Sequence, residues 1–146
     1  MPDTALPRGY ILGFDFGLRR IGVAIGQTAT HTASALETVR HGKSPDWQAI
    51  DRLVSEWKPV LFLVGLPLGA EGEHTEMSRA AQRFGNALHQ RYSLGVVFAD
   101  ERLSSHAAAS QFVELRASGS LRRKDASQLD AMAARIILEN WLQSGT

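Results

Sequence analysis

The sequence predicts an α/β fold in which a mixed five-stranded sheet carries helices on both faces. Two short apolar runs separated by a glycine-containing turn come first and indicate a β-hairpin. Beyond residue 44 apolar residues recur at helical spacing, and two later runs are continuously apolar, as in parallel strands buried on both faces. A meander followed by right-handed crossovers gives a mixed sheet, whereas a Rossmann domain would begin with a βαβ unit.

Length and composition indicate one ordinary globular domain. Of the 146 residues 44% are hydrophobic and 21% are charged, so we expect a single domain over 1–146, with a loose lead-in at 1–9 and a tail at 143–146. The absence of cysteine excludes disulfides, thiolate metal ligands and cysteine nucleophiles, and it fits a reducing cytoplasm. No membrane-spanning run or secretory signal is visible. A net charge of +1 neither demands nor excludes a nucleic-acid partner.

The first half of the expected sheet is a meander. The first strand is predicted over Tyr10–Phe16 and the second over Ile21–Gly26, with a four-residue turn at 17–20 between them. A third and weaker strand is expected within Thr30–Arg40. The first turn of the meander, at 17–20, therefore lies close after Asp15.

Helices and strands then alternate. Ser44 is expected to cap a helix that has Pro45 at its first position and ends before Pro59. A second helix is predicted from its apolar stripe, which consists of Met77, Ala81, Phe84 and Leu88. The two continuous apolar runs, Val60–Val64 and Gly95–Ala99, are expected to be buried parallel strands.

The C-terminal part is expected to be helical. A helix starts near Ser104 or Ser105 and runs to about Leu115, and a polar loop follows at Ala117–Lys124. Asp125 is expected to cap a final helix that is apolar nearly all round and therefore buried. Its core stripe is predicted to be Leu129, Met132, Ala133, Ile136 and Ile137.

Asp15 is the first candidate functional residue. It lies in an otherwise apolar strand between Phe14 and Phe16, where a carboxylate is costly to bury without a cation or several donors. Gly13 and Gly17 on either side would let a ligand approach the backbone closely. The alternative is that Asp15 only begins the turn and accepts backbone N–H groups.

Asp100 and Glu101 form the second candidate, just beyond the carboxyl end of a predicted parallel strand. Open α/β sheets bind ligands at that edge, but taken alone the charges are better explained by a solvated strand–helix loop. Asp130 is the third candidate. Aspartate is a poor residue for the interior of a buried helix, and Arg135 at i+5 is badly placed to pair with it. We therefore interpret Asp130 as functional.

These acids come from the first strand, the end of the last strand and the last helix, which can converge at one end of the sheet. Carboxylates without cysteine are hard oxygen ligands, suited to Mg²⁺ or Mn²⁺. Phosphodiester hydrolysis is the chemistry that such a site serves best. Basic residues could hold the phosphates, either as Arg19 and Arg20 in the first turn or as the loop residues Arg116, Arg122, Arg123 and Lys124. The loop could equally be a solvated surface.

Four ordered motifs resemble those of the YqgF/RuvX family. They are Gly13-Phe14-Asp15-Phe16-Gly17 with Arg20-Ile21-Gly22-Val23-Ala24, Val64-Gly65-Leu66-Pro67-Leu68 with Gly72, Asp100-Glu101-Arg102-Leu103-Ser104, and Asp130-Ala131-Met132-Ala133-Ala134 with Ile136-Ile137-Leu138. The similarity covers about residues 10–142 and implies a ribonuclease H-like fold similar to that of the Holliday junction resolvase RuvC. It also implies a divalent-metal nuclease centre, with Asp15, Glu101 and Asp130 as catalytic residues and metal ligands. Asp100 stays open as the alternative to Glu101.

The resemblance further implies a role in maturing the 5′ end of pre-16S ribosomal RNA, with the ribosome as a further candidate partner. The rival substrate is a branched DNA junction, and the rival class is a non-catalytic, ribosome-associated nucleic-acid-binding factor. Asp15-Phe16-Gly17 also resembles the phosphate loop of actin-like ATPases and sugar kinases, but those enzymes clamp nucleotide between two such domains. The sequence leaves monomer and homodimer both open.

Overall fold

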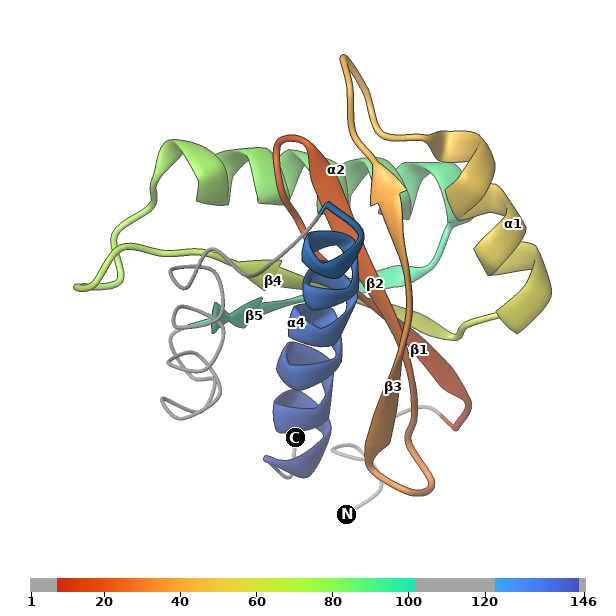
Figure 1. Cartoon of the computed structure of the whole chain (residues 1–146). Coiled ribbons are helices and arrows are strands. Elements are labelled where there is room, and N and C mark those ends of the chain that lie inside the picture. Colours follow the sequence, from red (N-terminus) through yellow and green to blue (C-terminus); the bar gives the residue numbers. More distant parts are fainter. Residues whose placement is uncertain (1–7, 102–122, 145–146) are drawn as a thin grey trace.

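The computed structural model describes residues 8–101 and 123–144 and shows a five-stranded mixed sheet (Figure 1). The strand order is β3-β2-β1-β4-β5, with β1 antiparallel to β2 and parallel to β4. The strands are β1 (Tyr10–Asp15), β2 (Arg20–Gln27), β3 (Thr32–Arg40), β4 (Leu61–Leu66) and β5 (Gly95–Asp100). The helices are α1 (Trp47–Trp57), α2 (Glu76–Tyr92) and α4 (Arg123–Gln143). The predicted meander and parallel crossovers are confirmed, and the helix expected over about 104–115 lies outside the described residues.

Alternating side chains divide the sheet into two buried faces. On β1, Leu12 and Phe14 belong to the core under α1 and α2, whereas Ile11 belongs to the core under α4. The same alternation on β4 places Phe62 with the first core and Leu63 with the second. In the β1 pattern Gly13 and Asp15 follow Ile11 on the α4 face. The fold therefore directs the carboxylate of the first strand toward α4.

The two edge strands differ from their predicted character. β3 is a full nine-residue strand rather than a weak one, and it pairs with β2 along its whole length. β5 was expected to be buried, but its residues are half-buried except the exposed Gly95. The reason is its place at the sheet edge, beyond β4, where it has one strand neighbour instead of two. A continuous apolar run thus predicts a parallel strand correctly and its burial only in part.

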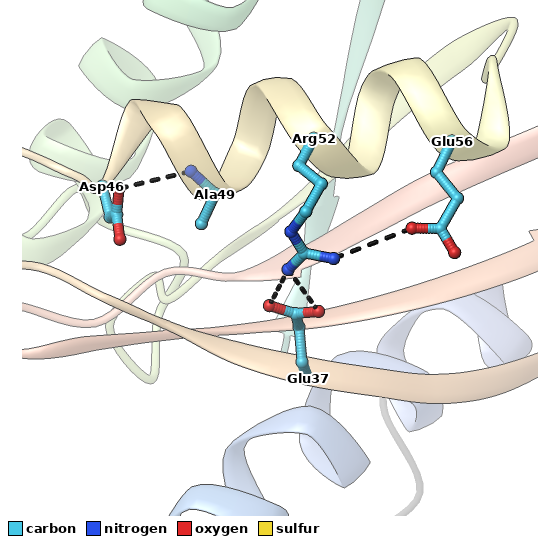
Figure 2. Close-up of polar contacts among 5 residues, drawn as sticks. All are labelled: Glu37, Asp46, Ala49, Arg52 and Glu56. Atoms are coloured by element: carbon cyan, nitrogen blue, oxygen red, sulfur yellow. Dashed lines mark hydrogen bonds and ion pairs between the residues drawn. The ribbon is translucent and has the colours of Figure 1, made fainter.

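Helix α1 begins two residues later than predicted. Its N-cap is Asp46, whose carboxylate accepts the backbone N–H of Ala49 at 3.2 Å, so Ser44 is not the cap. Pro45 instead lies in an isolated bridge with His41. Figure 2 shows this cap together with Arg52, whose guanidinium bonds both carboxylate oxygens of Glu37 on β3 at 2.9 and 2.8 Å. Because these groups lie largely in water, the pair orients α1 rather than adding much stability.

Helix α2 follows its predicted stripe. Ala81, Phe84 and Leu88 are buried against the sheet, and Met77 is half-buried. Thr75 caps the helix and forms a reciprocal pair of hydrogen bonds with Ser78, which satisfies two backbone donors at the helix start. This helix covers β4 and β5 on the face opposite α4.

Helix α4 crosses the other face of the sheet and corrects two predictions. It begins at Arg123, so Asp125 lies inside the helix instead of capping it. The predicted stripe is confirmed at Leu129 and Ile137 and wrong at its other three positions, because Met132 is 41% exposed and Ala133 and Ile136 are half-buried. The helix is therefore not buried all round. The buried positions on α4 are Leu129, Ala131, Ala134, Ile137, Leu138 and Leu142.

Small residues on the sheet decide which side of α4 is inside. A Cβ on Gly26 would come within 2.8 Å of Leu142, and one on Gly13 within 3.1 Å of Leu138. Larger residues would push the helix outward, since interiors are close-packed. These glycines let α4 lie directly on β1 and β2, beside the end of β1 that carries Asp15.

Candidate active site

Strand register determines which acid joins Asp15. Val64 of β4 pairs with Phe14 on one side and with Phe98 of β5 on the other. Along β5, Val96 and Phe98 pack on the core under α1 and α2, whereas Val97 and Ala99 pack on the core under α4. Continued alternation assigns Asp100 to the first face and Glu101 to the face that carries Asp15. The geometry thus favours Glu101 over Asp100 as the companion of Asp15.

Gly65 leaves the space that the carboxyl group of Glu101 occupies. It follows Val64 on β4, which lies between β1 and β5; β1 ends at Asp15, and Glu101 directly follows β5. A Cβ built on Gly65 would lie 2.7 Å from Oε1 of Glu101 and 3.1 Å from Cδ1 of Ile137. The Glu101 carboxyl therefore lies over the bare backbone of β4, where any larger residue would displace it.

Asp15 and Glu101 share a hydrogen bond between their carboxyl groups. Burial raises the pKa of Glu101 to about 9, and the negative charges of Asp15 and Asp100 contribute to the same shift. Two carboxyl groups this close share a proton because both cannot ionise cheaply without a cation. Two carboxyl groups this close are typical of a site that binds a cation and not of a surface ion pair that stabilises the fold.

Asp130 reaches the same region from α4 by its backbone. Gly22 pairs with Asp15 across the hairpin, and a Cβ on Gly22 would overlap the carbonyl oxygen of Asp130. The Asp130 main chain therefore lies one strand away from Asp15, on the same face of the sheet. This contact requires glycine at position 22.

The Asp130 side chain contacts a residue that the sequence interpretation did not pair with it. Nε of Arg20, at the start of β2, donates to Oδ2 of Asp130 at 2.6 Å. The Asp130 side chain is 13% exposed and that of Arg20 is 43% exposed. Arg135, the helical alternative, pairs instead with Glu139 at 3.9 Å. Arg20 thus gives Asp130 a cationic partner from another element, and the functional role of Asp130 stays a prediction.

Asp15, Glu101 and Asp130 carry the type of ligand atom that binds a divalent cation, but the three side chains do not all lie together. Within residues 8–101 and 123–144, no group of three or more Asp, Glu, His or Cys side chains is close enough to hold a metal ion. Asp15 and Glu101 form a pair of hard oxygen donors, the ligand type that Mg²⁺ and Mn²⁺ prefer. Asp130 has its backbone beside that pair and its carboxylate on Arg20.

Comparison with known proteins identifies the family of this chain. The model of the RuvX family, described as Holliday junction resolvase, matches residues 9–144. The chain belongs to the RuvX family. A relative from Xanthomonas oryzae pv. oryzae is 46% identical, and the match covers 97% of this chain and 94% of the relative. A second, from Xylella fastidiosa, is 47% identical with the same coverage. Both carry the name "Putative pre-16S rRNA nuclease".

Solved structures confirm the predicted ribonuclease H-like fold. Thermus thermophilus RuvC, in complex with a Holliday junction, aligns with a TM-score of 0.53 at 17% identity over 93% of this chain and 94% of RuvC. The yeast mitochondrial Holliday junction resolvase Ydc2 also has a TM-score of 0.53, at 13% identity over 95% of this chain and 80% of Ydc2. With the family match, these findings confirm the predicted family and fold, and they support a nuclease. No helix in the described ranges is long and apolar enough to cross a bilayer.

The predicted phosphate-binding residues fall into two groups. Arg19 and Arg20 are exposed at the β1–β2 turn, and Arg20 pairs with Asp130. The loop residues Arg116 and Arg122 lie outside the described residues. Arg123 and Lys124 begin α4, and the structure describes only their backbone. Phosphate binding by either basic group therefore stays a prediction.

Sequence reasoning missed the roles of Gly65 and Gly22. In the sequence both glycines stand only as members of the motifs that resemble those of the family, with no role of their own. The available signal was a glycine inside an apolar strand, which often marks a close approach of another group. Which group approaches could not be known, because Glu101 and Asp130 are remote in sequence.

Proposed function

We propose that this RuvX-family chain is a divalent-metal-dependent nuclease that uses Asp15, Glu101 and Asp130 as its ligands. The observation that carries the proposal is the hydrogen-bonded pair of Asp15 and Glu101, which lies beside the backbone of Asp130 on one face of the sheet. Mg²⁺ or Mn²⁺ held by these oxygens would supply charge neutralisation and an activated water for phosphodiester hydrolysis.

The chain's own residues prepare that chemistry. Asp15, at the end of β1, is held by pairing with Gly22 of β2, and the preceding residue, Phe14, pairs with Val64 of β4. Glu101 holds a proton in the metal-free site, and that proton must leave when the carboxyl becomes a ligand. Arg19 and Arg20 are proposed to hold substrate phosphates beside the acids.

We propose pre-16S ribosomal RNA as the substrate, with its 5′ end as the position of cleavage. The support is the name carried by relatives of 46 and 47% identity that match nearly the whole chain. Branched DNA is the second candidate, because the matching family model is described as a Holliday junction resolvase. A ribosomal RNA precursor would place the reaction in the cytoplasm and make assembling ribosomes a partner.

The test compares both substrates in one assay. Purified protein is offered a precursor ribosomal RNA and a four-way DNA junction, each with and without Mn²⁺. We expect metal-dependent cleavage of the RNA, little cleavage of the junction, and no cleavage by Asp15→Asn. Glu56→Gln is the matched control, since it removes one carboxylate from the exposed end of α1 on the opposite face.

Three results would change the proposal. Preferential cutting of the junction would exchange the two substrates. Cleavage that survives Asp15→Asn would remove the metal site from these residues. Metal-independent binding of RNA without any cleavage would favour the non-catalytic accessory factor.

A further inference from the structure

The ion pair between Arg20 and Asp130 joins residues 110 positions apart at the edge of the proposed metal site. Its 2.6 Å contact uses Nε of the guanidinium, and the Asp130 side chain is mostly shielded from water. Arg20 begins β2, directly after the turn that follows Asp15. The pair therefore connects the strand hairpin to α4 where the candidate ligands meet.

The backbone of Asp130 is fixed while its side chain has a choice of partners. Its carbonyl oxygen lies so close to Gly22 that no Cβ fits between them, and Gly22 pairs with Asp15. Because the main chain is held at this point, an exchange of Arg20 for the region of Asp15 and Glu101 would take place by rotation of the Asp130 side chain, without movement of α4.

Arg20 also has a competing partner in the proposed reaction. A guanidinium binds phosphodiester oxygens through charge-assisted hydrogen bonds, with the same donors that it offers a carboxylate. Its 43% exposure leaves it accessible to a nucleic-acid strand. A phosphate bound to Arg20 neutralises the charge that holds Asp130, so the carboxylate loses its main attraction to that position.

We propose that Arg20 is a positioning residue that couples nucleic-acid binding to completion of the metal site. In the free protein Arg20 holds the Asp130 carboxylate, and a substrate phosphate displaces it toward Asp15 and Glu101. This inference rests on the proposed nuclease function and deepens it. Because coupling between two binding events is reciprocal, metal must tighten nucleic-acid binding by the same factor.

The experiment measures Mn²⁺ affinity by calorimetry, so it does not depend on catalysis. Parent protein, Arg20→Gln and Arg19→Gln are titrated with and without a phosphorothioate oligoribonucleotide, which keeps the backbone charge and resists cleavage. Arg19→Gln is the matched control for charge and leaves the Arg20–Asp130 pair intact. As a second proposed phosphate-binding residue, Arg19 is expected to contribute to oligoribonucleotide affinity, so the coupling is compared at saturating oligoribonucleotide. A second measurement follows the Nε–H resonance of Arg20 by NMR, assigned from its loss in Arg20→Lys.

We expect the oligoribonucleotide to tighten Mn²⁺ binding to the parent by roughly five- to tenfold, at the low end of typical coupling. Arg20→Gln should bind Mn²⁺ tightly without the oligoribonucleotide and gain little from it, whereas Arg19→Gln should keep the coupling. The Nε–H resonance of Arg20 in the parent should shift when the oligoribonucleotide is added.

Equal Mn²⁺ affinities and equal coupling in Arg20→Gln and Arg19→Gln would overturn the inference, as would an unchanged Nε–H resonance in the parent. Asp15→Asn separates this failure from that of the proposed function. If Asp15→Asn binds Mn²⁺ as the parent does, the metal site itself is misplaced. If Asp15→Asn abolishes binding and Arg20→Gln changes nothing, only the role of Arg20 is refuted.

Discussion

Gly65→Ala is expected to impair the proposed reaction without unfolding the protein. The added Cβ would lie 2.7 Å from Oε1 of Glu101, whereas ordinary contacts begin near 3.4 Å, so the carboxyl must move by about 0.7 Å. The other close atoms are the terminal Cδ1 of Ile137, at 3.1 Å, and Cγ of the same Glu101 side chain, at 3.2 Å. These atoms belong to flexible side chains, which yield more easily than backbone.

The magnitude follows from that displacement. Misplacing a catalytic group by about 1 Å can cost on the order of 100-fold in rate, so a shift of about 0.7 Å should lower kcat by roughly 10- to 100-fold. The free energy of unfolding should change little. Alanine in a strand interior is more stable than glycine by roughly 0.5–1 kcal/mol, and this gain offsets the local strain. Loss of rate with an unchanged Tm is therefore the expected signature.

The assay pairs precursor-RNA cleavage with Mn²⁺ titration and thermal unfolding. Gly95→Ala is the matched control, since it makes the same change at the opposite end of a neighbouring strand, where the nearest atom is Cδ1 of Leu61 at 3.2 Å. Parent-like cleavage and Mn²⁺ affinity in Gly65→Ala would refute the reasoning, because Glu101 would then not depend on the space above β4. An equal loss in Gly95→Ala would attribute the effect to glycine replacement in general.

Four further predictions concern the acids and the basic loop. The folded-state pKa of Glu101 (about 9) exceeds its ordinary value of 4.5, so the metal-free protein should lose stability as pH rises from about 5 to about 9. Urea unfolding should show a smaller fall in the free energy of unfolding over this pH range in Glu101→Gln. An equal fall in the variant and the parent would contradict the prediction. Asp15→Asn should raise the Tm in metal-free buffer by removing the like charge, and a lowered Tm would speak against crowding. Glu101→Gln should reduce cleavage more than Asp100→Asn, whose side chain belongs to the other face; the reverse order would exchange their roles. Replacing Arg122 and Arg123 by alanine should weaken nucleic-acid binding and flatten its salt dependence by about one unit of slope per lost phosphate contact, whereas coincident binding curves would show a solvated loop.

The order of helices and strands could be read from local patterns, because each depends on neighbours in sequence. The hairpin, the buried parallel strands and the stripe of α2 follow from alternation and helical spacing alone. The cap of α1 was misassigned because Ser44-Pro45 and Asp46 are both good helix starts. The bridge between His41 and Pro45 extends the chain there and delays the helix to Trp47.

The buried side of α4 could not be read in the same way. The helix is apolar on more than one side, so spacing alone offers several stripes of similar quality. The choice was made by the small residues of β1 and β2, which admit Leu138 and Leu142 and leave Met132 exposed. Packing against a partner surface is a property of two segments, and the sequence of one segment does not contain it.

The sequence by itself determined the candidate acids and the family motifs, since an acid in an apolar strand or a buried helix is recognisable from its neighbours. Only the tertiary structure shows that the carboxyl group of Glu101 bonds to that of Asp15, because a shift of one residue in strand register would exchange the two faces of the sheet. It also decided that Asp130 meets Arg20, a contact across 110 residues that no local pattern encodes. Which residues are acidic can be read from the sequence. Which of them meet depends on the distant groups for which Gly22 and Gly65 leave room, the backbone of Asp130 and the side chain of Glu101.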